Sequence, residues 1–237
     1  MIAFWEGAGA VALYLLIAAS TAFALRLMVR IPDEWFRKGL HFILLGAYIP
    51  FVFAFQVWWH AALFALIIML VAYPIIKWFE HFRSFTAVTT ERKHGEFKNS
   101  LILAFSVMIL CIAVTWGWLN DKLLGLASVY AWGVGDAFAA LVGKRYGKHT
   151  IRLPGADPRK SVEGSAAMMI TSAVAVMIVL LVRGGMPTGS CALIALAGAA
   201  VAALVELYTK GGYDTITCPA AAMLVILPLT KLLGGAV

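Results

Sequence analysis

Long runs of apolar residues, separated by short polar stretches, dominate the chain. A helix needs about 20 apolar residues to cross a hydrocarbon layer of roughly 30 Å, whereas a transmembrane strand needs only about 10 residues that alternate in polarity. Because the runs have the helical length, the pattern predicts an all-α, polytopic membrane bundle of about eight transmembrane helices. The predicted spans cover residues 4–25, 39–55, 57–79, 99–119, 123–143, 165–182, 190–208 and 217–235.

The composition agrees with this pattern. Of the 237 residues, 62% are hydrophobic and 13% are charged, and the mean hydropathy is +0.90, values that exclude an ordinary soluble domain. The sequence contains no fixed-period repeat and no linker long enough to separate domains. We therefore predict one transmembrane helical domain, residues 1–237.

The positions of the cations predict the orientation. Most of the 19 Lys and Arg residues follow the first, third, fifth and seventh predicted spans. Short loops rich in Lys and Arg stay cytoplasmic, so we expect these loops in the cytoplasm and both termini outside it. The net charge of +7 is explained by contact with anionic lipid head groups, and the sequence contains no nucleic-acid-binding motif. Nucleic acid is therefore not an expected partner.

Asp136 is a carboxylate inside the fifth predicted span. An ionised group in a membrane helix costs several kcal/mol unless another group compensates it, which makes Asp136 a candidate functional residue. It lies seven residues before Gly143, or roughly 10 Å along a helix that rises about 1.5 Å per residue, so it is accessible from the predicted cytoplasmic side. The alternative is a structural carboxylate paired with a Lys or Arg of another helix.

A second polar group lies at the entrance to the second predicted span. Arg37 and His41 are four residues apart and share a helix face, with Lys38 adjacent. These residues suit a positively charged phosphate-binding site, with His41 as a general acid or base. Alternatively, they are a positively charged anchor at the membrane surface.

A third group lies in the loop that precedes the sixth predicted span. The loop starts at Lys144, after Gly143, and leads through Lys160 and Ser161 to Gly164. A helix N-terminus offers free backbone N–H groups and a positive dipole end, so these residues are candidates for holding a nucleotide phosphate. A solvated basic loop with a serine helix cap is the alternative.

Two further carboxylates, Glu206 and Asp214, flank a short turn between the seventh and eighth predicted spans. Hard oxygen ligands suit Mg²⁺, which usually takes one or two carboxylates together with substrate phosphates. Together with Asp136 they place three carboxylates at the predicted cytoplasmic face. The sequence thus predicts a magnesium site made by Asp136, Glu206 and Asp214, although capping and loop solvation also explain the last two.

These groups, in this order, resemble the dolichol kinase, phytol kinase and CTP-dependent diacylglycerol kinase family. The resemblance covers about residues 34 to 219, and its central block is the most specific part. One departure is Asp214-Thr215, where the family pattern has Asp-Asn. The matching residues are Arg37-Lys38-x-x-His41, Gly135-Asp136-x-x-Ala139-x-x-Val142-Gly143, Tyr146-Gly147, Lys160-Ser161-x-Glu163-Gly164-Ser165, Glu206, Asp214 and Pro219.

The resemblance implies phosphoryl transfer from CTP to the hydroxyl of a membrane lipid alcohol: a polyprenol, a phytol-like alcohol or diacylglycerol. It also implies a compact bacterial-type member in the inner membrane, with Mg²⁺ as cofactor. Asp136 is then a metal ligand or the group that accepts the alcohol proton. The resulting expectation is a catalytic set of Asp136, Arg37, Lys38 and His41, a nucleotide-binding set of Lys144, Lys160, Ser161, Gly143 and Gly164, and a metal set of Asp136, Glu206 and Asp214.

Two other functions are compatible with parts of the sequence. A phosphatidate cytidylyltransferase also uses CTP and Mg²⁺ in a helical membrane scaffold, but attacks the α-phosphate. A transporter for an anion would place polar residues in both halves of the membrane, whereas here they gather near one side. Patches of small residues such as Gly198-Ala199-Ala200 suit internal helix packing or a homodimer contact equally well.

Overall fold

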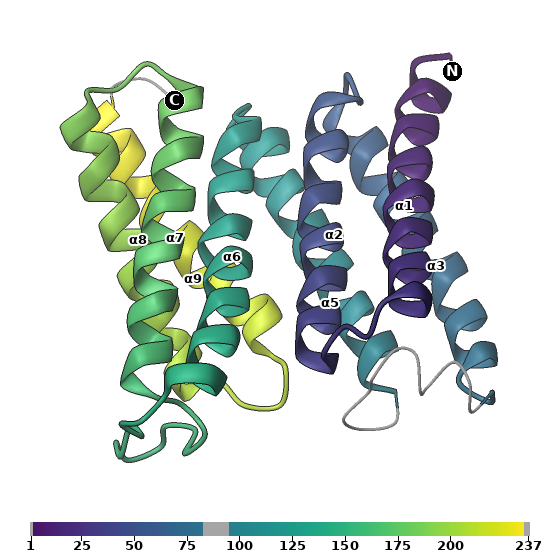
Figure 1. Cartoon of the computed structure of the whole chain (residues 1–237). Coiled ribbons are helices and arrows are strands. Elements are labelled where there is room, and N and C mark those ends of the chain that lie inside the picture. Colours follow the sequence, from purple (N-terminus) through teal and green to yellow (C-terminus); the bar gives the residue numbers. More distant parts are fainter. Residues whose placement is uncertain (1, 83–94, 235–237) are drawn as a thin grey trace. The chain divides into compact units, whose positions relative to one another are not determined.

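The computed structural model describes residues 2–82 and 95–234 of the chain. Within these ranges eight helices are long and apolar enough to cross a membrane, which confirms the predicted all-α membrane bundle (Figure 1). The described residues include no strand, and their one isolated β-bridge joins Thr150 to Ser161.

The helices group into two compact units, Met1–Ala113 and Val114–Val237. No change of composition in the sequence marks this boundary. The prediction of a single domain for residues 1–237 stays a prediction, because one membrane domain can contain two clusters of helices.

Unit 1 has a core of aromatic side chains. Phe51 and Phe55 are one helical turn apart and their rings are stacked, with centroids 6.3 Å apart and planes at 14°. Phe64 lies against both, and Phe105 meets the Phe51 ring edge-on. Such pairs stabilise a core beyond simple burial. The helices of this unit are α1 (Ile2–Met28), α2 (Asp33–Phe53), α3 (Trp58–Phe79) and α5 (Glu96–Cys111).

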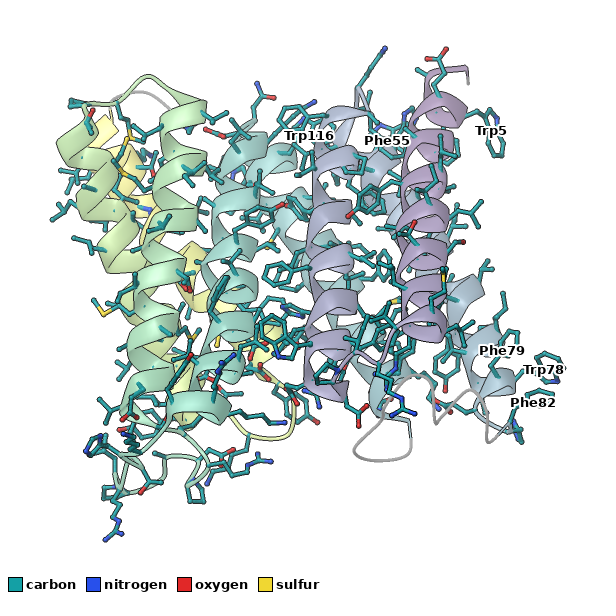
Figure 2. All side chains as sticks on the ribbon, in the orientation of Figure 1. Trp5, Phe55, Trp78, Phe79, Phe82 and Trp116 are labelled. Atoms are coloured by element: carbon teal, nitrogen blue, oxygen red, sulfur yellow. The ribbon has the colours of Figure 1, made fainter. Side chains whose placement is uncertain are left out.

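Exposed aromatic side chains lie near both ends of unit 1. Trp5 projects outward near the start of α1, and Trp78, Phe79 and Phe82 cluster where α3 ends (Figure 2). Amphipathic rings concentrate where a bilayer meets water. Their positions therefore fit a unit that spans the membrane between these two levels.

Unit 2 is built around α6, which packs on α7, α8 and α9. The span that contains α5 ends in a π-helical segment, η1, and its final residues belong to this unit. At one end of the unit Asp121 caps α6 by accepting from the Leu123 and Leu124 N–H groups, and it also binds Arg183 Nε at 2.5 Å. The elements are η1 (Ile112–Trp118), α6 (Lys122–Tyr146), α7 (Val162–Arg183), α8 (Thr188–Tyr208) and α9 (Asp214–Gly234).

Small residues let α6 and α7 approach closely. A Cβ atom added at Gly164 would lie 2.9 Å from the carbonyl oxygen of Ala139 and 3.3 Å from Gly143 Cα. Two turns further along α7, the Ser172 hydroxyl donates to the Ala131 carbonyl. Close backbone approach between small residues is a common way for membrane helices to associate. This packing fixes the part of α6 that carries Asp136.

Most helices begin before the predicted spans, and four begin three or more residues early, including α5 at Glu96 rather than residue 99. α2 begins at Asp33 rather than residue 39, α7 at Val162 rather than 165, and α9 at Asp214 rather than 217. The extra turns are polar, so hydropathy alone missed them. Ser161 caps α7 by accepting from the Gly164 N–H at 3.1 Å, and acidic residues in the first turns of α2 and α9 favour a helix N-terminus.

Candidate functional site

Two loops lie at one end of unit 2 (Figure 1). Residues 147–161 join α6 to α7, and residues 209–213 join α8 to α9. The longer loop is held to the last turn of α8, because the Asp157 N–H donates to the Leu207 carbonyl at 2.9 Å. The loops are thus in direct contact with the helix end that carries Glu206.

The longer loop has its own backbone structure. Its two arms pair through the Thr150–Ser161 bridge. The Ile151 N–H donates to the Lys160 carbonyl at 3.0 Å, and the Val162 N–H donates to the His149 carbonyl at 2.9 Å. Lys160 and Ser161 therefore stand on a paired arm that leads directly into α7.

Asp157 is buried in this loop and is held by Arg159. Arg159 Nε lies 3.0 and 3.2 Å from the two carboxylate oxygens, and the Arg159 backbone N–H donates to the same side chain at 3.0 Å. These hydrogen bonds to the Arg159 guanidinium lower the pKa of Asp157 from 3.8 to about 2, against the opposing effect of burial. The same contact raises the pKa of Arg159.

This ion pair predicts a specific pH dependence. An Asp whose pKa is lowered on folding stabilises the protein above its unfolded pKa, here 3.8, and the stabilisation is lost as the pH falls through about 2. Asp157→Asn is therefore expected to lower the melting temperature in detergent by a constant amount above pH 4, and the difference from wild type should shrink towards pH 2. Thermal unfolding of both proteins across this range measures it, and a difference that is the same at every pH contradicts it.

Lys160 forms an ion pair with Glu206, 46 residues away on α8. Glu206 is only 1% exposed, and Lys160 is partly buried. A buried carboxylate needs a paired charge. Lys160 supplies this charge to Glu206.

α6 and α9 place further predicted residues together. Trp132 lies one turn before Asp136 on α6 and donates through Nε1 to Asp214 Oδ2 at 3.4 Å. On α9, Cys218 lies one turn after Asp214. Its buried thiol is within electrostatic reach of Asp214, Asp136 and Lys160. The Trp132–Asp214 hydrogen bond thus joins α9 to the face of α6 that carries Asp136.

The predicted magnesium ligands Asp136 and Asp214 lie on α6 and α9, two helices that pack together. Within residues 2–82 and 95–234, no three His, Cys, Asp or Glu side chains form a group that could hold a metal by themselves. The expected cluster of Asp136, Glu206 and Asp214 is thus not assembled as a ligand set. Mg²⁺ in phosphoryl-transfer sites needs only one or two carboxylates plus substrate phosphates, so a magnesium site at Asp136 and Asp214 stays a prediction.

The predicted cations of α2 belong to unit 1. Arg37 forms an ion pair with Glu34 at 3.3 Å, and Lys38 is buried with only 7% of its surface exposed. His41 is half-buried one turn after Arg37. The other predicted site residues belong to unit 2. A shared pocket for the two sets stays a prediction.

The remaining predicted nucleotide ligands have structural roles as well. Lys144 is exposed in the last turn of α6, and Ser161 caps α7. Gly143 and Gly164 lie where α6 and α7 touch, which alone explains glycine at both positions. Their contact with a nucleotide stays a prediction.

Sequence reasoning missed two partners in this region. Trp132 was not singled out, although its spacing of four from Asp136 places both on one face of α6. His149 lies in the loop, and its Nδ1 is 2.7 Å from Glu163 Oε1, which links the loop to the first turn of α7. The position of Trp132 could be inferred from its helical spacing to Asp136, whereas no sequence pattern indicates the His149–Glu163 contact.

Comparisons with known proteins give one partial similarity. Over 85 residues, the chain is 34% identical to a probable chloroplastic phytol kinase from Triticum aestivum. The similar stretch covers 36% of this chain and 26% of that protein, so it spans about a quarter of the relative's length. No protein-family model matches the chain, and no solved structure matches it.

Proposed function

We propose that this protein is a membrane kinase that transfers a phosphoryl group from CTP to the hydroxyl of a lipid alcohol. The observation that carries the proposal is that Trp132, one turn before Asp136 on α6, binds Asp214 of α9, while Lys160 of the adjoining loop is paired with Glu206 of α8. The partial similarity to a probable phytol kinase supports the same class of acceptor, a polyprenol, a phytol-like alcohol or diacylglycerol. In this proposal the site faces the cytoplasm of a bacterial cell and both termini lie outside it.

The proposed chemistry depends on electrostatics and positioning. A phosphoryl group passes through a loose transition state with its charge spread over the equatorial oxygens, so the protein mainly aligns the reactants and neutralises charge. Lys160 and Lys144, both in unit 2, are the proposed cations for the triphosphate. Ser161 lies at the α7 N-terminus, where backbone N–H groups favour an anion.

Asp136 has one of two proposed roles. It ligates Mg²⁺ together with Asp214, or it accepts the proton of the lipid hydroxyl as that oxygen attacks the γ-phosphate. Bound Mg²⁺ supplies charge neutralisation on the phosphate oxygens. Both roles require a carboxylate that the lipid and the nucleotide reach together, and Asp136 is only partly buried.

The products of the reaction test the proposal. Purified protein in detergent is incubated with Mg²⁺, CTP labelled at the α- or γ-phosphate, and a panel of the three lipid alcohols. The proposal expects CDP and a lipid phosphate that carries the γ-label. Pyrophosphate with a CDP-lipid would instead indicate a cytidylyltransferase, and the absence of both products with every alcohol would overturn the proposal.

A further inference from the structure

We infer that Glu206 is a positioning residue, which holds the Lys160 ammonium in the site and does not ligate the metal. This inference rests on the proposed function, because it assigns Lys160 to the nucleotide phosphates. It replaces the metal role that the sequence indicated for Glu206. The contacts of the last turn of α8 carry the argument.

Burial and charge make Glu206 a poor ligand for an exchanging ion. Only 1% of its surface is exposed, and its Oε1 atom is bonded to Lys160. A metal at Glu206 would have to displace the Lys160 ammonium from that carboxylate. Removing one member of a buried ion pair is far more costly than removing both, so Glu206 and Lys160 behave as one unit.

Neighbouring contacts show that this turn of α8 is built to hold the loop. Leu207 accepts the Asp157 N–H through its carbonyl at 2.9 Å. The ring of Tyr208 lies beside Gly155, where an added Cβ atom would be 3.7 Å from the ring. Consecutive residues of α8 therefore hold the loop at three points, and the ion pair is the point nearest α7.

The electrostatic environment of α9 connects the same loop residue with the carboxylates of α6 and α9. Lys160, Asp136 and Asp214 all act electrostatically on the Cys218 thiol. Glu206 holds the ammonium to α8, the helix that packs against both α6 and α9, which carry the two carboxylates proposed for Mg²⁺. A fixed ammonium near a bound Mg²⁺ suits the binding of a phosphate group, because both positive charges neutralise the negative charge on the phosphate oxygens.

Two variants of the full-length protein in detergent test the inference. Glu206→Gln removes the charge but keeps a side chain of the same shape, and Lys160→Met/Glu206→Met removes both charges of this ion pair together. The matched control is Glu80→Gln in unit 1, where Glu80 is buried and bonded to Lys98 at 2.8 Å. The measurements are the KM for CTP, the Mg²⁺ concentration for half-maximal rate, and the shift of melting temperature on adding CTP.

A positioning role changes nucleotide binding and leaves the metal dependence alone. Glu206→Gln should raise the KM for CTP by about tenfold, the loss expected for one charge-assisted contact, while the half-saturating Mg²⁺ concentration changes less than about twofold. The double Met variant should fold yet show no CTP-dependent thermal shift. Glu80→Gln should leave both kinetic constants at wild-type values.

Other outcomes overturn the inference in distinguishable ways. If Glu206→Gln raises the half-saturating Mg²⁺ concentration as much as the KM for CTP, Glu206 is a metal ligand. If the double Met variant keeps the CTP-dependent thermal shift, Lys160 does not hold the nucleotide. If wild-type protein phosphorylates no lipid alcohol, the proposed function itself fails, a result visible before any variant is made.

Discussion

Replacing Asp136 by Asn is expected to abolish lipid phosphorylation and to leave the protein folded. Asn has nearly the same shape as Asp, so the packing of α6 should survive. It neither ligates Mg²⁺ as a carboxylate does nor accepts a proton, and the rate should fall by about 10³-fold or more in either role. The measurement is the initial rate of CTP-dependent lipid phosphorylation beside the thermal unfolding curve.

Asp121→Asn provides the control on the same helix. Asp121 caps the opposite end of α6 and binds Arg183, so its loss should lower stability and leave the KM and rate per folded molecule unchanged. Full activity of Asp136→Asn would remove Asp136 from both proposed roles. An unfolded Asp136→Asn protein would instead favour a structural carboxylate.

Gly164→Ala is expected to destabilise unit 2 by about 1–3 kcal/mol, the usual cost of overpacking a close contact. The added methyl would meet backbone atoms of α6, the Ala139 carbonyl oxygen at 2.9 Å and Gly143 Cα at 3.3 Å. Backbone atoms cannot rotate away, so the two helices must separate. Chemical or thermal unfolding in detergent measures the loss.

Gly189→Ala is the matched control in α8, because a Cβ atom there meets nothing within 4 Å. It should be neutral or stabilise the helix by up to about 1 kcal/mol, through the better helix propensity of Ala. Equal stability of the Gly164→Ala and Gly189→Ala proteins would show that α6 and α7 do not depend on the close approach at Gly164.

The helical membrane fold was predictable because long stretches of high hydropathy directly indicate membrane-spanning helices. A buried apolar segment of about 20 residues has few other structures open to it in a membrane. The polar first turns of α2, α7 and α9 were missed for the same reason: they form through capping and first-turn charges, which a hydropathy window averages away. The longer α2 places Arg37 on a helix, as its spacing from His41 indicated.

The sequence could nominate candidate site residues but could not predict their pairings. Asp136, Lys160 and Asp214 each stand out in the sequence as a charge at a span or its edge. That Lys160 would bind Glu206 depends on how α8 packs beside the α6–α7 loop, and no local pattern records a contact over 46 residues. A metal role was therefore predicted for Glu206 only because a carboxylate suits Mg²⁺. Its burial favours the role of holding the Lys160 side chain in position.

The paired arms of the α6–α7 loop have a consequence for association with any anionic ligand. Fixing the backbone of a residue costs about 1–2 kcal/mol of conformational entropy. A flexible loop would pay this cost for every residue that becomes ordered when the ligand binds. Here the Thr150–Ser161 bridge and the Asp157–Leu207 hydrogen bond have already ordered the segment. Capture of a ligand at Lys160 then starts from a prearranged surface, and its affinity is not diminished by folding the loop anew.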